Sequence, residues 1–231
     1  MSGTPHPSRR AAVATALLPL AFLVTSALPA AAEWDVDSCE GKEVTATVTD
    51  KSPAVVTLGD ADDVVLIEDP GHQVFLEGGD DYVCGSDGAD VVHGGGGSDR
   101  LYGKGGPDTL YGDDNHDKLI GDLGRDKEYG GKGVDYLSGG PGADQQNGGP
   151  DSDYLYGDEQ PDVMDGNGGD DVLEGGKGAD DVSGGRGDDC LKGGDGEDEL
   201  AGEGGKDVVQ QDDVVEDKVD DGAADDKVTD S

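Results

Sequence analysis

Aromatic residues, basic residues and long apolar runs are all scarce in this chain of 231 residues. Aromatic side chains make up 4% of it, and 16 lysines and arginines stand against 54 aspartates and glutamates, for a formal net charge of −38. Low hydrophobicity combined with high net charge is typical of disordered chains, so disorder is the first hypothesis. Such an acidic chain repels nucleic acid and anionic lipid and attracts cations.

The one long apolar run covers residues 11–30, follows two arginines and ends in three alanines. This pattern predicts a signal peptide over residues 1–32, cleaved near Ala32, and therefore a secreted, extracellular protein. A retained membrane anchor is the alternative, but Pro19 and Pro29 would make a poor spanning helix, so no membrane insertion is expected. The segment "SRR" is similar to the start of a twin-arginine signal, but the hydrophobic pair expected after it is weak. The general secretory route is therefore favoured.

Cysteine is rare, with three residues in the whole chain. In an exported protein this number allows at most one intramolecular disulfide and leaves one thiol over. We expect a bond between Cys39 and Cys84, with Cys190 free. A free Cys84 with some other pairing stays open, because connectivity cannot be read from sequence.

Sequence patterns of enzymes are missing as well. His72, His93 and His116 lie in or beside a glycine-rich region without the HExxH spacing of zinc enzymes, and no nucleophile elbow is present. Residues 33–57, which precede that region, are too few for a catalytic core. We therefore predict that the protein is not an enzyme.

What the chain does contain is a repeat of nine residues, rich in its 43 glycines. With the aspartate numbered position 6, fifteen units follow one another without an insertion, position 1 is glycine from Gly85 to Gly202, and position 8 is mostly aliphatic. An uninterrupted period of this kind indicates a stacked repeat architecture rather than disorder. The position-6 residues are Asp81, Asp90, Asp99, Asp108, Asp117, Asp126, Asp135, Asp144, Asp153, Asp162, Asp171, Asp180, Asp189, Asp198 and Asp207.

Each position of the unit has a physical role. Glycines at positions 1, 2 and 4 allow positive φ and a tight turn. The last three residues fit a very short strand whose middle side chain, at position 8, points inward. One unit cannot bury anything alone, so the units must stack into a solenoid whose thin core is the column of position-8 side chains.

The units "GGRGDDCLK" from Gly184 and "GGDGEDELA" from Gly193 resemble the haemolysin-type (RTX) calcium-binding repeat, GGxGxDxUx. The resemblance implies an all-β, right-handed parallel β-roll with two units per turn over residues 58–210. Residues 33–57 would then form an N-terminal cap, and residues 211–231 an acidic C-terminal cap or tail. It also implies that each Ca²⁺ lies between one loop and the loop eighteen residues later. The position-6 aspartate would supply the carboxylate, and loop carbonyls much of the remainder.

The chemistry of the loops favours calcium independently. Ca²⁺ takes six to eight oxygen ligands, and a glycine-rich turn exposes carbonyl oxygens beside the aspartate. Stacked carboxylates repel one another when no cation lies between them. Calcium binding and folding are therefore expected to be one equilibrium involving multiple ions. A solenoid of purely structural aspartate turns, without metal, is the alternative.

Four units depart from the pattern. Glu128 and Gln146 occupy the inward position 8 eighteen residues apart, so we expect them to hydrogen-bond to each other in a weak layer between residues 126 and 150. Gln160 replaces a position-4 glycine before a proline, which makes its loop the weakest predicted calcium site. His72 stands where an aspartate is due and is predicted not to form a site.

Tyrosine is confined to the outward strand positions 7 and 9, and five of the seven tyrosines fall on one face. Such a face could bind a glycan or a protein surface. The plainer interpretation, that aromatic residues suit exposed strand surfaces, is favoured. We predict a secreted calcium-binding protein with a structural or interaction role; the alternative is a glycan-binding or accessory component of an extracellular enzyme or toxin system. The tyrosines are Tyr82, Tyr102, Tyr111, Tyr129, Tyr136, Tyr154 and Tyr156.

Overall fold

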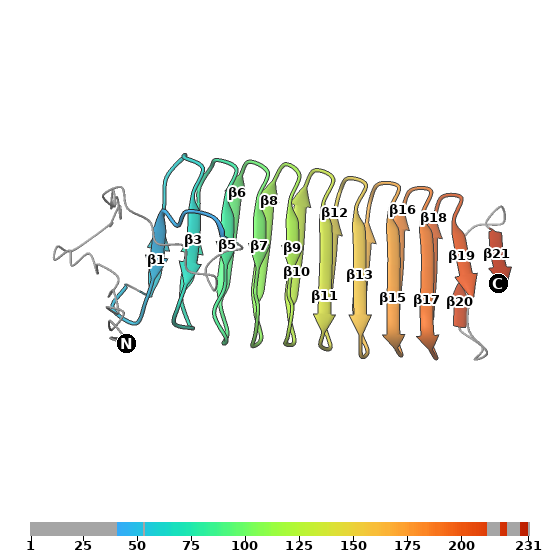
Figure 1. Ribbon diagram of the computed structural model, residues 1–231. Helices are drawn as coiled ribbons and strands as arrows, with labels where there is room; N and C mark the ends of the chain where they lie inside the picture. Colours follow the sequence, from blue (N-terminus) through green and yellow to red (C-terminus); the bar gives the residue numbers. More distant parts are fainter. Residues whose placement is uncertain (1–40, 53, 212–217, 221–226, 231) are drawn as a thin grey trace, which may run out of the picture.

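The computed structural model describes residues 41–52, 54–211, 218–220 and 227–230, and this part of the chain forms two parallel β-sheets (Figure 1). The chain alternates between the sheets, so that each pair of strands makes one coil of a solenoid. The predicted signal peptide and Cys39 lie outside the described residues.

Odd-numbered strands form the first sheet and even-numbered strands the second. The 11-stranded sheet contains β1 (Ala46–Val48), β3 (Val64–Ile67), β5 (Tyr82–Cys84), β7 (Arg100–Tyr102), β9 (Lys118–Ile120), β11 (Tyr136–Pro141), β13 (Tyr154–Glu159), β15 (Val172–Gly178), β17 (Cys190–Gly196), β19 (Val208–Gln211) and β21 (Lys227–Asp230). The 10-stranded sheet contains β2 (Val55–Thr57), β4 (Gln73–Phe75), β6 (Val91–Gly96), β8 (Thr109–Asp114), β10 (Lys127–Lys132), β12 (Gln145–Gly149), β14 (Val163–Asn167), β16 (Asp181–Arg186), β18 (Glu199–Gly204) and β20 (Lys218–Asp220).

The register between neighbouring coils follows the repeat. Leu137 pairs with Leu155, eighteen residues later, and equivalent pairs recur along both sheets. Each two-unit turn therefore superposes like positions, as expected when two nine-residue units close one coil. The predicted all-β parallel β-solenoid is confirmed, and no α-helix occurs in the described ranges.

The sheets also extend beyond the regular repeats. Ala46 pairs with Val65, and Val209 with Val228, in each case nineteen residues apart instead of eighteen. The strands β1 and β2 lie within residues 33–57, and β20 and β21 within residues 211–231. At both ends, then, one coil accommodates an extra residue while its strand still joins the parallel sheet.

The core is the predicted column of position-8 side chains. Leucines, valines and one methionine, from Val83 to Val209, are almost completely buried between the sheets. Two polar side chains interrupt the column, fully buried Glu128 and Gln146 at 3% exposure. Gln146 Nε2 donates to Glu128 Oε2 at 2.7 Å and to the carbonyl oxygen of Tyr156 at 2.9 Å. The expected hydrogen bond between the two side chains is confirmed.

Two further expectations concern the cysteines and membrane insertion. Cys84 is disulfide-bonded and Cys190 is free, in agreement with the predicted pairing at the two described cysteines.

Among the described residues, no helix is long and apolar enough to cross a membrane.

Candidate metal centre

The fifteen predicted aspartates form two columns, one along each edge of the solenoid, where the chain crosses from one sheet to the other. Each aspartate ends a loop and directly precedes a strand, and every one is buried, with at most 4% of its surface exposed. The first column contains Asp81, Asp99, Asp117, Asp135, Asp153, Asp171, Asp189 and Asp207. The second contains Asp90, Asp108, Asp126, Asp144, Asp162, Asp180 and Asp198.

One carboxylate oxygen of each aspartate binds the backbone of the preceding coil. The backbone N–H of Asp162 donates to Oδ1 of Asp180 at 2.9 Å, and the equivalent bond, 2.7 to 2.9 Å long, forms at every predicted aspartate except Asp90. These bonds satisfy amides that lie in the buried crossing between sheets. The repeat pattern did not lead us to predict this structural role, although an aspartate constant at both i and i+18 was a sign of it.

The other carboxylate oxygen lacks a hydrogen-bond donor. In the aspartates from Asp81 to Asp189, Asp90 apart, Oδ2 is buried and has no hydrogen-bond partner. Buried acceptors of this kind are rare in folded proteins and indicate a missing partner, such as a proton or an ion. The two oxygens of one carboxylate thus have separate roles, one in the backbone and one available to a ligand.

The position-1 glycines leave the space that such a ligand needs. At Gly175, an added Cβ would lie 2.5 Å from Asp180 Oδ2 and 2.6 Å from the carbonyl oxygen of Gly193 in the next coil. The same close approach recurs at Gly103, Gly121 and neighbouring coils. A carboxylate oxygen and a carbonyl oxygen from adjacent coils therefore face one small cradle that any side chain would fill.

Burial and mutual repulsion raise the pKa of these carboxyl groups. The pKa of Asp108 is raised to about 8, mainly by burial and to a smaller extent by the charges of Asp126 and Asp90, against a hydrogen bond from the backbone of Asp90 that lowers it. The pKa of Asp117 rises to about 8 and that of Asp171 to about 6, in each case mainly through burial. A cation beside Oδ2 would favour the ionised form and reverse these shifts.

The donor set of the loops fits a hard cation. Within the described ranges, no three His, Cys, Asp or Glu side chains gather into one metal-binding group. Any ion would therefore take one carboxylate oxygen per loop and complete its shell with carbonyls and water. Ca²⁺ accepts such mixed oxygen ligands in a flexible geometry, whereas zinc-type sites use several His or Cys side chains.

The irregular units lie where the sequence placed them. His72 occupies the aspartate position, and its Nδ1 lies 3.0 Å from the carbonyl oxygen of Asp69. In the next coil of that column, Asp90 Oδ2 accepts hydrogen bonds from the N–H and hydroxyl of Ser86, both at 2.8 Å. Gln160 takes a left-handed φ of 77°, yet Asp162 keeps the same bonds as its neighbours.

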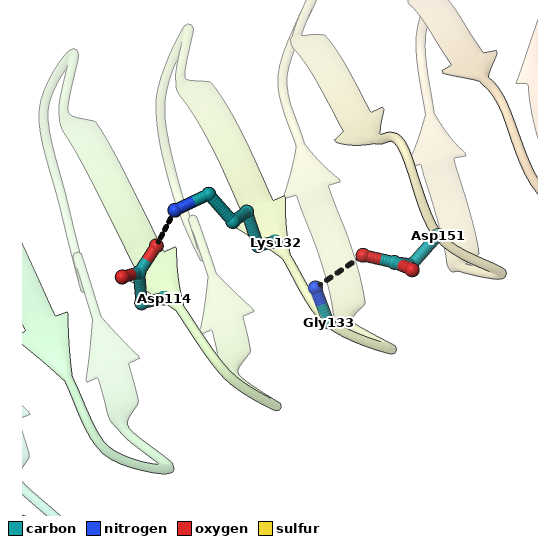
Figure 2. A network of polar contacts seen from close by, with 4 residues as sticks. All are labelled: Asp114, Lys132, Gly133 and Asp151. Carbon is teal, nitrogen blue, oxygen red and sulfur yellow. Dashed lines mark hydrogen bonds and ion pairs between the residues drawn. The ribbon is translucent and has the colours of Figure 1, made fainter.

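A further set of side chains links the loops of the first column from coil to coil. At position 5, Asp62 Oδ1 accepts from the N–H of Asp80, and Asp170 Oδ1 from that of Asp188. Figure 2 shows two related links: Lys132 Nζ lies 2.6 Å from Asp114 Oδ1, and Gly133 N–H donates to Asp151. The repeat pattern alone did not identify these contacts, because the residues at positions 3 and 5, and the Asp151 that replaces a position-4 glycine, vary along the chain.

Comparison with known proteins agrees with this geometry. A family model described as the RTX calcium-binding nonapeptide repeat, in four copies, is similar to residues 74–92, 93–128, 129–146, 147–182 and 175–209. Together these segments span both columns from β4 to β19. No curated protein matches the chain.

Proposed function

Because the chain belongs to the family of RTX calcium-binding nonapeptide repeat proteins, we propose that it is a secreted protein whose β-roll folds when calcium binds between its coils. The roll itself is the functional product, with a structural or interaction role outside the cell. The observation that carries this proposal is the series of buried aspartates with an unpartnered Oδ2, which in many coils lies beside a carbonyl oxygen of the next coil.

The proposed calcium ligands are the fifteen position-6 aspartates, from Asp81 to Asp207. Each provides Oδ2 to the ion and keeps Oδ1 on the backbone amide of the preceding coil, except Asp90, whose Oδ1 is the free oxygen. Asp90 also accepts a hydrogen bond from the Ser86 hydroxyl, so we expect its calcium site and that of Asp162 to be the two weakest in their column.

Bound calcium would also offset much of the negative charge of the chain. A formal charge of −38 opposes compaction through self-repulsion. About a dozen bound Ca²⁺ ions would offset roughly 24 of these charges, so the ions stabilise the fold both locally and through the overall field. Low calcium inside a cell and high calcium outside it would keep the chain open before export and fold it afterwards.

We propose a non-catalytic protein because its buried carboxyl groups hold the solenoid together. The buried carboxyl groups lie in the crossings between sheets and bind backbone amides, and the family repeat describes a calcium-binding scaffold. A cleaved signal over residues 1–32 would deliver this scaffold to the calcium-rich exterior.

The decisive test is a calcium titration of residues 33–231 followed by far-UV circular dichroism and calorimetry, with magnesium as the control ion. We expect a cooperative coil-to-β transition near millimolar calcium, which is normal for extracellular sites. Asp171→Asn retains an Oδ1 acceptor but loses the charge, so it should bind fewer ions and require more calcium to fold. Asp181→Asn, an exposed aspartate of β16, is the matched control. A β-signal already complete in chelator at neutral pH would contradict the proposal.

A further inference from the structure

The outer face of the 11-stranded sheet differs in charge from the rest of the molecule. In strands β3 to β19, its outward positions 7 and 9 carry three cations, Arg100, Lys118 and Lys192, and one carboxylate, Glu174. The same positions of the 10-stranded sheet, from β2 to β18, carry Lys127 against three acids, Asp165, Asp181 and Glu199. In a chain with an excess of 38 negative charges, the side chains at these outward positions are net basic, while the loop end of β13 adds two acids, Asp158 and Glu159.

Two of its cations lie side by side without a carboxylate partner. Arg100 and Lys118 are direct register partners on β7 and β9. Among the described residues neither forms an ion pair, whereas Lys192 is paired with Glu174. Like charges directly opposite each other destabilise a sheet. Both side chains are exposed, so an anion from outside could neutralise the pair.

Tyrosines continue this basic patch along the sheet. Lys118 Nζ lies 5.3 Å from the ring centre of Tyr136, and Tyr154 on the next strand is 45% exposed with no ring contact among the described residues. On the opposite sheet the rings of Phe75, His93, Tyr111 and Tyr129 stack on one another, 4.2 to 4.8 Å apart, so their faces are occupied. On the 11-stranded sheet, by contrast, Tyr154 is an exposed ring without such a contact in the described part of the chain.

The same face is already covered one coil before the open part begins. Tyr82 and Cys84 of β5 point outward but are buried, and they pack with Val44. Lys42 Nζ lies 4.4 Å from the ring centre of Tyr82. The outer surface of this sheet thus takes a chain laid flat across it, and the open part from β7 to β13 continues that covered region.

The shape and charge of the open surface from β7 to β13 indicate which kind of ligand would bind there. The surface is flat, so it suits an extended polymer rather than a small anion. A polymer of sugar rings places its C–H faces on tyrosine and its acidic groups on the cations, which matches both features of the patch. A second copy of this chain, seated on the same face, would place its own Arg100 and Lys118 against this pair, and like charges in contact oppose such association.

We infer that the outer face of strands β7 to β13 binds an acidic polysaccharide, running along the solenoid axis over Arg100, Lys118, Tyr136 and Tyr154. The inference rests on the proposed function, because the patch exists only in the folded roll and calcium lowers the repulsion between the acidic loops and the polymer. Arg100 and Lys118 bind the acidic groups, and Tyr154 provides the stacking face.

The test measures binding of fluorescent hyaluronan oligosaccharides to the calcium-loaded mature chain at low ionic strength. Circular dichroism on the same samples reports whether the roll has folded, so a failure to fold is distinguished from a failure to bind. Arg100→Gln/Lys118→Gln should weaken binding about 10-fold, and Tyr154→Ala should also weaken it. Lys127→Gln, at the equivalent position of the opposite sheet, is the matched control and should leave binding unchanged.

Added salt should weaken binding, because the contacts are exposed charges. Three results would overturn the inference: no binding by a fully folded roll, undiminished binding by the Arg100/Lys118 double variant, or equally tight binding of poly-glutamate, which would indicate an acidic protein partner. Binding of a neutral maltodextrin with the same affinity would likewise refute the role of the cations.

Discussion

The buried polar pair Glu128 and Gln146 should lower the stability of the roll, and the two side chains should do so as a coupled unit. They replace two adjacent members of a column that is otherwise aliphatic, with Leu110 before them and Met164 after them in the same sheet. Neither Oε1 atom has a hydrogen-bond partner. Burial raises the pKa of Glu128 well above its ordinary value, so its neutral form is favoured inside the core.

The magnitude follows from these contacts. Each unpartnered buried oxygen costs about 1–3 kcal/mol, and replacing a buried polar pair by apolar residues of similar volume commonly stabilises a protein by about 1–4 kcal/mol. We therefore expect Glu128→Leu/Gln146→Leu to raise the free energy of unfolding by about 2–4 kcal/mol. Each single variant leaves the other polar side chain without its partner and should lower it by about 1–3 kcal/mol.

Guanidinium unfolding of the calcium-loaded mature chain, with all four members of the double-mutant cycle, provides the measurement. Because stacked repeats unfold through their weakest interface, removing the polar layer should also sharpen the transition. The reasoning is refuted if both single variants stabilise the protein and their effects add up to that of the double variant. In that case the two side chains are not coupled, and the hydrogen bond at 2.7 Å contributes nothing.

Two further predictions concern the loops. Burial raises the pKa of Asp81 to about 7 and that of Asp108 to about 8, so the calcium-free roll is most stable below pH 3.8, the ordinary pKa of aspartate, and loses stability as the pH rises towards 8. Circular dichroism in chelator should therefore show more β-structure at pH 5 than at pH 8, and no change with pH would contradict this. Gly187→Ala should lose at least about 2 kcal/mol of stability, because φ is 133° there and a Cβ would overlap the carbonyl oxygen of Gly169. Gly204→Ala, whose Cβ would lie 3.5 Å from its nearest neighbour, is the control, and equal melting temperatures for the two variants would count against the loop geometry.

Most of the architecture could be predicted from the nine-residue period. A strict period fixes which residues recur at the same place in every unit, and stacking then brings like positions together. The core column, the two rows of aspartates and the contact between Glu128 and Gln146 all followed from this rule. The concentration of tyrosines on one face followed as well, because the two units of a coil lie on opposite sheets.

Other features depended on contacts that no period encodes. In the aspartates from Asp81 to Asp189, Asp90 apart, one carboxylate oxygen binds a backbone amide and the other has no hydrogen-bond partner, and this division depends on packing between coils. The coils closed by nineteen residues, at Ala46 and at Val228, lie outside the repeat and join the sheets through long-range pairing alone. Burial of the outward-pointing Tyr82 depends on the covering contacts of Lys42 and Val44.

The sequence by itself determined that this chain is a β-solenoid of calcium-binding repeats. Its regular glycines define the turn of every unit, its aspartates the expected metal ligand, and its aliphatic residues the core. Only the tertiary structure decided where the surface differs from one coil to the next. The juxtaposition of Arg100 and Lys118, neither of which forms an ion pair within the described part of the chain, arises when two units eighteen residues apart become neighbours across a sheet. Residues at variable positions carry no periodic signal, so their partners become apparent only after the coils are stacked.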